Sequence, residues 1–192
     1  VGLLTFHQEI VDYIPARFRP GHMHRLMISL EKSLAGEDTD LRRPMEHIAD
    51  LVSKRGMFVL ISDLLAPIDR LRESLSYLRS RGHEVVVMRI LDPAERDFSF
   101  ADPAMFQDLE TGRQLYVDPQ SMRETYLERF QEHSAKVSDI CGTLGIEIFD
   151  FTSERPLELA LFDFMQARSR RGKTIHHRAS FASSSAGAST SS

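Results

Sequence analysis

Two strongly apolar segments, with a helical pattern between them, constrain the fold of this chain more than any other feature. Residues 57–61 form an uninterrupted apolar run, which is typical of a parallel strand that is covered on both faces. Residues 85–91, apolar except for Arg89, predict the next buried strand. From Ile68 to Leu78 apolar residues recur at helical spacing, and Gly82 follows where a helix ends. Strand, helix and strand in this order predict a βαβ unit with a right-handed crossover.

The rest of the chain continues this alternation of strands and helices. We predict strands at 1–6, 10–14 and 146–151, helices at 23–34, 41–52, 122–144 and 157–165, and a small hairpin from 106–109 and 114–117. Alternating elements of this kind form a sheet whose strands are mostly parallel. The predicted fold class is therefore α/β, with a doubly wound and mostly parallel sheet.

Composition favours one domain in a reducing compartment. The 192 residues are 42% hydrophobic and 27% charged, which fits a single globular domain with an ordinary core. Cys141 is the only cysteine, so an internal disulfide is excluded and a cytoplasmic location is expected. The net charge of −4 argues against a nucleic-acid partner. No apolar run approaches the roughly 18 residues of a membrane helix, so no membrane segment is expected either.

The two ends of the sequence bear on the expected domain organisation. The chain starts with Val1 rather than Met, and residues 1–6 already have the pattern of a strand, so we expect the natural chain to begin earlier. Residues 179–192 are almost entirely Ser and Ala, a composition that buries too little apolar surface to fold. The expected organisation is a partial domain over 1–172 and a disordered Ser/Ala-rich tail over 173–192.

Oxygen-bearing side chains stand at the positions where α/β proteins bind ligands. Thr39 precedes the helix predicted at 41–52, Asp63 follows the strand at 57–61, and Asp92 follows the next strand. Ligands bind beyond the carboxyl ends of the strands in open α/β sheets, and hydroxyl and carboxylate oxygens are the ligands that Mg2+ prefers. The same residues also have a purely structural interpretation, in which Thr39 and Asp63 cap the helices that follow them.

Five short segments carry a resemblance to a known family. They are residues 1–6 (Val-Gly-Leu-Leu-Thr-Phe), 38–41 (Asp-Thr-Asp-Leu), 59–63 (Val-Leu-Ile-Ser-Asp), 89–93 (Arg-Ile-Leu-Asp-Pro) and 108–112 (Asp-Leu-Glu-Thr-Gly). On these segments the chain resembles the domain of unknown function 58 family, and the resemblance extends to about Gly172. It implies a domain similar to the von Willebrand factor A (vWA) fold, which this chain enters after the first strand and helix.

The resemblance also implies a role and a metal site. Members of the family are typically encoded beside MoxR-type AAA+ ATPases, which implies a metal-dependent partner or adaptor rather than an enzyme. In vWA domains the metal-ion-dependent adhesion site combines an Asp-x-Ser-x-Ser loop with a distant Thr and a distant Asp, which Thr39 and Asp63 match. The loop itself is not in this chain, so binding of Mg2+ or Mn2+ is expected of the full-length protein.

The resemblance also predicts that two strands of the sheet are not neighbours. The first strand of a vWA domain lies between the strands that correspond here to residues 1–6 and 57–61, so these two segments are expected not to pair with each other.

Two other functions stay open beside the interaction module. One is a magnesium-dependent phosphoryl hydrolase that uses Asp63 and Asp92, because a fold does not by itself fix a function. The other is a structural adaptor without an ion. No carboxylate pair and no Ser, His and Asp set stands at catalytic spacing, so no catalytic residue is assigned. His22 and His24 lie two apart on a predicted helix and are expected to be exposed rather than metal-bound.

Overall fold

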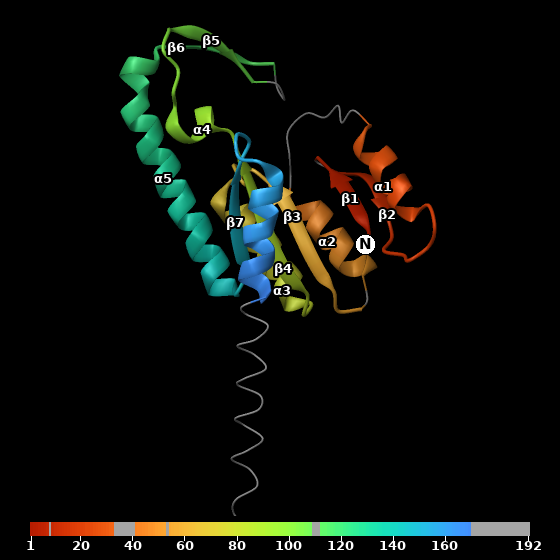
Figure 1. Ribbon diagram of the computed structural model, residues 1–192. Helices are drawn as coiled ribbons and strands as arrows, with labels where there is room; N and C mark the ends of the chain where they lie inside the picture. The colour runs from red at the N-terminus through yellow and green to blue at the C-terminus, as the bar shows by residue number, and fades with distance from the viewer. Residues whose placement is uncertain (8, 33–40, 53, 109–111, 170–192) are drawn as a thin grey trace, which may run out of the picture.

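A three-stranded parallel sheet organises the larger part of the chain. In the computed structural model, which describes residues 1–7, 9–32, 41–52, 54–108 and 112–169, the strands lie in the order β3, β4, β7 (Figure 1). Their bounds are Met57–Ser62 for β3, Glu84–Leu91 for β4 and Glu147–Thr152 for β7. The two apolar runs of the sequence are therefore neighbouring parallel strands, and the predicted α/β class with a parallel sheet is confirmed.

One face of this sheet forms the hydrophobic core together with three helices. These helices are α2 (Arg42–Leu51), α3 (Ile68–Ser80) and α5 (Pro119–Leu144). The core contains Met45 and Ile48 of α2, Leu71, Leu75 and Leu78 of α3, Val137 and Ile140 of α5, and Leu60, Val85 and Val87 of the strands. The strand residues alternate, so each second side chain enters this core and the others face the opposite side.

The opposite face of the sheet is covered over β7 and β4 by a helical segment at 157–169. The rings of Phe149 and Phe164 meet edge to face with centroids 4.9 Å apart, and Arg168 pairs with Glu84 at 2.6 Å. This segment confirms the helix predicted at 157–165. Over β3 the same face stays open, and its side chains Met57, Val59 and Ile61 are 52%, 40% and 64% exposed.

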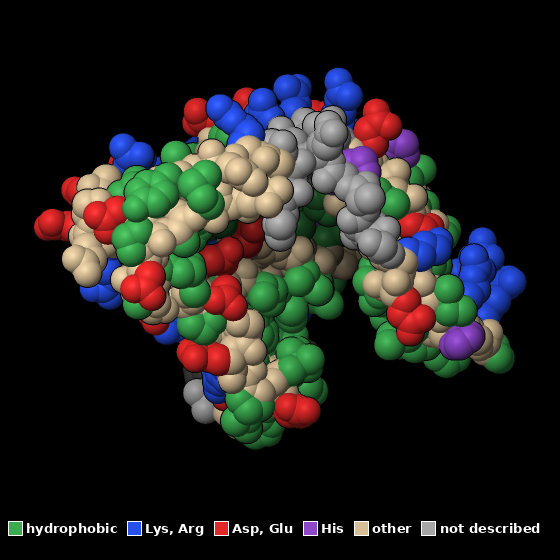
Figure 2. Space-filling view, turned by 90° about the horizontal axis from the view of Figure 1, so that it is seen from above, with side chains coloured by type: hydrophobic (Ala, Val, Ile, Leu, Met, Phe, Trp, Pro, Cys, Tyr) green, Lys and Arg blue, Asp and Glu red, His purple; other side chains and the backbone are tan. Residues whose placement is uncertain are grey.

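An N-terminal unit lies beside the sheet. It consists of the antiparallel hairpin β1 (Leu3–Phe6) and β2 (Ile10–Ile14) and the helix α1 (His22–Leu30). Seen from above, this unit forms the right-hand lobe of the molecule (Figure 2), and its side chains Leu4, Phe6 and Tyr13 pack against the core that the sheet shares with its helices. Among the described residues β1 pairs only with β2, and β3 only with β4, so the expectation that segments 1–6 and 57–61 do not pair is confirmed.

Two hydrogen bonds hold α1 on this hairpin. Nε2 of His22 lies 2.7 Å from the carbonyl oxygen of Val1, and the hydroxyl of Ser29 donates to Asp12 over 2.6 Å. The expectation that His22 is exposed is therefore wrong, because its ring is needed to satisfy a backbone carbonyl and is 9% exposed. His24, on another side of the helix, is exposed as expected.

Several predicted boundaries differ from the structure. The short helix α4 (Pro93–Asp97) was not predicted, although Pro in its first turn and a capping box from Asp92 and Glu95 favour a helix start. The hairpin strand predicted at 106–109 is β5, Ala104–Gln107, and it pairs with β6, Gln114–Val117. The helix α1 ends at Leu30, four residues before the end predicted at residue 34. The tail predicted at 173–192 lies outside the described residues.

Candidate functional site

The chain turns sharply at the carboxyl end of β3, and this turn carries Asp63. The hydroxyl oxygen of Ser62 accepts a hydrogen bond from the amide of Leu64 at 3.1 Å, and Oδ1 of Asp63 accepts one from the amide of Leu65 at 3.1 Å. Both are local side-chain to backbone bonds that stabilise turns. Leu64 adopts a left-handed backbone conformation, with φ of 58°, which is unfavourable for a residue with a branched side chain.

Tertiary contacts compensate for this unfavourable conformation. The side chain of Leu64 is 1% exposed and belongs to the core. Nε2 of His133, on α5, lies 2.8 Å from the carbonyl oxygen of Leu64 and donates to it. A backbone outlier held from two sides in this way is typical of positions where the structure fixes one particular geometry. The turn therefore presents Asp63 in a defined place at the carboxyl edge of the sheet.

The carboxylate of Asp63 is exposed and only partly used by the turn. Its Oδ1 accepts from Leu65 and lies 3.5 Å from the hydroxyl of Ser62, whereas Oδ2 has no hydrogen-bond partner among the described residues. The interpretation of Asp63 as a helix cap is wrong, because α3 begins at Ile68 with Pro67 in the cap position and no side-chain cap bond. Oδ2 of Asp63 can therefore accept a hydrogen bond or approach a cation from outside.

The second predicted ligand, Thr39, lies outside the described residues. The neighbouring helix α2 begins at Arg42 with Leu41 in the cap position and without a side-chain cap bond. Whether the side chain of Thr39 contributes to the start of this helix lies outside the described residues.

Asp92, at the carboxyl end of β4, is engaged on both oxygens. Oδ1 accepts from the amide of Ala94 at 2.8 Å, and Oδ2 accepts from the hydroxyl of Ser153 at 2.9 Å. The side chain of Glu95 completes the capping box by accepting from the amide of Asp92 at 3.2 Å. This carboxylate stabilises the start of α4 and ties it to the end of β7, so it is a structural residue in this arrangement.

These donors do not build a complete cation site by themselves. Within the part of the chain that the structure describes, no three side chains of His, Cys, Asp or Glu stand close enough together to hold a metal ion. Asp63 supplies a single free carboxylate oxygen, whereas Mg2+ requires near-octahedral coordination by oxygen ligands. A cation at this edge would need Thr39 and further ligands from outside the described residues.

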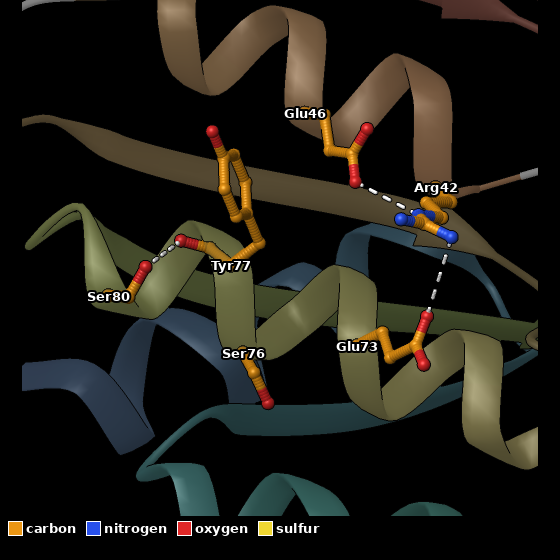
Figure 3. A pocket seen from close by; sticks show the side chains of 6 residues that line it. All are labelled: Arg42, Glu46, Glu73, Ser76, Tyr77 and Ser80. Atoms are coloured by element: carbon orange, nitrogen blue, oxygen red, sulfur yellow. Dashed lines mark hydrogen bonds and ion pairs between the residues drawn. The ribbon is translucent and has the colours of Figure 1, made fainter.

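An open hollow on the surface of the helices offers no comparable site. It lies between α2 and α3 and is lined by Arg42, Glu46, Glu73, Ser76, Tyr77 and Ser80 (Figure 3). Arg42 pairs with Glu46 at 2.9 Å and with Glu73 at 4.0 Å. The charged groups of this hollow therefore satisfy one another, and they are exposed to water, where such pairs contribute little.

Two polar side chains that stabilise the fold were not predicted from the sequence. Arg89 of β4 is 7% exposed and forms two hydrogen bonds, of 2.7 and 2.9 Å, with Asp150 on β7. His133 occupies a place in the apolar stripe of α5 between Phe130 and Val137. The sequence gives one indication of His133, because a polar residue stands there among apolar residues at helical spacing. It gives none for the contact of Arg89, because Asp150 lies 61 positions later in the chain.

The fold and this edge define an α/β domain with a parallel sheet and an exposed acidic turn. The family described as "Protein of unknown function DUF58" matches residues 1–136, and the chain belongs to this family. The matched residues include both β3 and the Asp63 turn.

Several uncharacterized mycobacterial proteins are similar to the chain. One from Mycobacterium bovis and one from Mycobacterium tuberculosis are each 27% identical over 183 residues, which cover 93% of this chain and 56% of the relative. One from Mycobacterium avium is 31% identical over 150 residues, covering 77% of this chain and 82% of the relative. The chain thus spans about half the length of the first two relatives.

No solved structure matches the chain significantly. In the described residues, no helix combines the length and the apolar character needed to cross a membrane.

Proposed function

We propose that this domain is a protein-interaction or adaptor module that works through the carboxyl edge of the β3, β4, β7 sheet. The observation that carries the proposal is the Asp63 turn. Its carboxylate is exposed, is placed by the backbone of a strained turn, and keeps Oδ2 without a hydrogen bond among the described residues. An exposed acid fixed at a ligand-binding edge is suited to recognise a partner.

In the full-length protein the edge holds Mg2+ or Mn2+ through Asp63 and Thr39, in the manner of a vWA domain. The support is the resemblance of the two residues to the distant members of a metal-ion-dependent adhesion site, together with the free oxygen of Asp63. A carboxylate from the partner would take an open coordination position on the ion. The partner we propose is a MoxR-type AAA+ ATPase, on the strength of the family resemblance.

Two alternatives make different demands on the same residues. An adaptor without an ion is favoured by the absence of a cluster of metal-binding side chains among the described residues. A magnesium-dependent phosphoryl hydrolase needs Asp63 and Asp92 together, but both oxygens of Asp92 already accept hydrogen bonds from Ala94 and Ser153. The geometry of Asp92 therefore argues against the hydrolase.

The test is binding of a purified MoxR-type ATPase from the same organism to the full-length protein, with Mg2+ and with a chelator. The metal-dependent module predicts binding that the chelator and Asp63→Asn both abolish, with Asp139→Asn as a control for loss of an exposed carboxylate on α5. Binding that survives chelation identifies an ion-free adaptor. Absence of binding in either condition contradicts the proposed partner.

A further inference from the structure

The loop that joins β2 to α1 carries positive charge that no acidic residue balances. Between residues 15 and 30 the chain has Arg17, Arg19 and Arg25 and no Asp or Glu, although its net charge is −4. All three arginines are exposed, and none of them forms an ion pair or hydrogen bond through its side chain with another described residue. Figure 2 shows Lys and Arg side chains projecting from the outer end of the right-hand lobe, to which this loop belongs.

An aromatic side chain stands between the first two arginines. Phe18 is fully exposed, at 105% of its reference area, so no other part of the described chain covers its ring. Met23, in the first turn of α1, is 63% exposed. Large apolar side chains are normally buried because their removal from water is favourable, and their joint exposure beside a cationic cluster indicates a contact surface.

The shape of this surface indicates which partner it fits. A fully exposed ring on a loop protrudes from the surface, so a protein partner would need a matching apolar pocket that is surrounded by acidic side chains. A lipid bilayer needs no such pocket, because its interface accepts a protruding aromatic ring between headgroups. Guanidinium groups on both sides of the ring can donate to lipid phosphates, and anionic headgroups attract clustered Lys and Arg.

We propose that the loop at 15–21, together with Arg25 and Met23 of α1, binds the surface of an anionic lipid bilayer. The net charge of the whole chain is negative, so most of its surface is repelled by such a bilayer and this lobe is the part that approaches it. The contact is peripheral and independent of the metal site proposed at Asp63. It orients the domain on the membrane and places the proposed interaction module at the membrane surface.

The test is co-sedimentation of the purified chain with large vesicles of phosphatidylcholine and phosphatidylglycerol in equal parts, and with vesicles of phosphatidylcholine alone. The chain is expected to sediment with the acidic vesicles only, and less so at high salt, because salt screens exposed charges. Arg17→Glu/Arg19→Glu and Phe18→Ser should each raise the lipid concentration needed for half-binding roughly tenfold or more. The three side chains are exposed, so these variants keep the fold, which circular dichroism checks.

Arg70→Glu/Arg72→Glu is the matched control, because it makes the same charge change at two exposed arginines of α3. It should leave vesicle binding unchanged. Equal loss in this control, or a Phe18→Ser variant that binds as the wild type does, overturns the proposal, since either result means that the surface acts through net charge alone. A wild-type chain that does not sediment with acidic vesicles also overturns it and leaves the loop to an acidic protein partner.

Discussion

Nε2 of His133 lies 2.8 Å from the carbonyl oxygen of Leu64, a residue 69 positions earlier in the chain. This hydrogen bond ties α5 to the turn behind β3 and so fixes the backbone next to Asp63. Because Leu64 is buried and has a left-handed conformation, the turn depends on contacts from outside itself. The geometry of the candidate site is therefore set by the packing of α5 against the sheet.

Replacing His133 by Ala should destabilise the domain by about 1 to 3 kcal/mol, because the carbonyl of Leu64 loses its hydrogen-bond donor. Urea denaturation followed by circular dichroism measures this difference. His47→Ala is the control, since His47 is an exposed histidine on α2 and its replacement should leave the free energy of unfolding nearly unchanged. Equal stability of His133→Ala and the wild type would contradict the anchoring role of His133.

The pair of Arg89 and Asp150 should respond unequally to the loss of either partner. The Arg89 side chain is 8% exposed and that of Asp150 is 57% exposed. Asp150→Ala leaves a buried guanidinium without its carboxylate, which should cost about 3 kcal/mol. Arg89→Met leaves a carboxylate that water can solvate and should cost less. Urea denaturation of both variants tests this order, and a larger loss in Arg89→Met would show that packing of the arginine matters more than its charge.

Stability should fall as the pH is lowered through the range where His83 titrates. His83 is 2% exposed, its Nδ1 accepts from the amide of Gly56 at 3.3 Å, and burial together with the nearby charge of Arg81 lowers its pKa below the usual 6.5. The unfolded chain therefore takes up a proton more readily than the folded chain. The stabilisation is complete above pH 6.5 and is lost as the pH falls towards the folded-state pKa.

His83→Asn removes the titrating group while its Oδ1 can still accept from Gly56. The variant should lose less stability than the wild type between neutral pH and about pH 5, as measured by the urea midpoint at each pH. His47→Asn should retain the pH dependence of the wild type. An unchanged pH dependence in His83→Asn would assign the effect to another group.

The outer edge of β3 should make the isolated chain weakly stable. In the described residues β3 has a neighbour on one side only, and its side chains Met57, Val59 and Ile61 are exposed on the open face. Unpaired strand edges leave backbone groups without protection. We expect a broad melt at low temperature and faster hydrogen exchange in β3 than in β4, which is paired on both sides. A sharp transition at high temperature would contradict this expectation.

The sequence was sufficient to predict the parallel strands and most of the helices, because their patterns are local. The apolar runs at β3 and β4 and the spacing on α3 each come from one continuous segment, although the expected cover on both faces of β3 is wrong for the described residues, where Met57, Val59 and Ile61 are exposed. Contacts between distant segments could not be predicted in this way. The burial of His22 depends on the carbonyl of Val1, 21 residues away, and a helical position alone does not reveal it.

In the candidate site, too, the sequence predicted what depends on a local pattern and not what depends on contacts between distant segments. Asp63 was predicted from its place after an apolar strand, and the structure puts it at that edge with an exposed carboxylate. Its role in the turn was missed, because a left-handed Leu64 is unfavourable by propensity and is held by His133 and by core packing. Thr39 lies outside the described residues, so its place beside Asp63 stays a prediction.

The central claim is that Asp63 and Thr39 bind a divalent cation in the full-length protein. Calorimetric titration with Mn2+, run beside a thermal melt, tests it on the wild type, Thr39→Ala, Asp63→Ala and the exposed-carboxylate control Asp139→Ala. We predict that the wild type and the control bind the ion, and that the other two variants bind it about tenfold or more weakly. Loss of the turn hydrogen bond in Asp63→Ala should cost only about 1 kcal/mol of stability. If Thr39→Ala and Asp63→Ala bind Mn2+ as the wild type does and only their melting temperatures fall, the two residues are structural and the metal-dependent function is wrong.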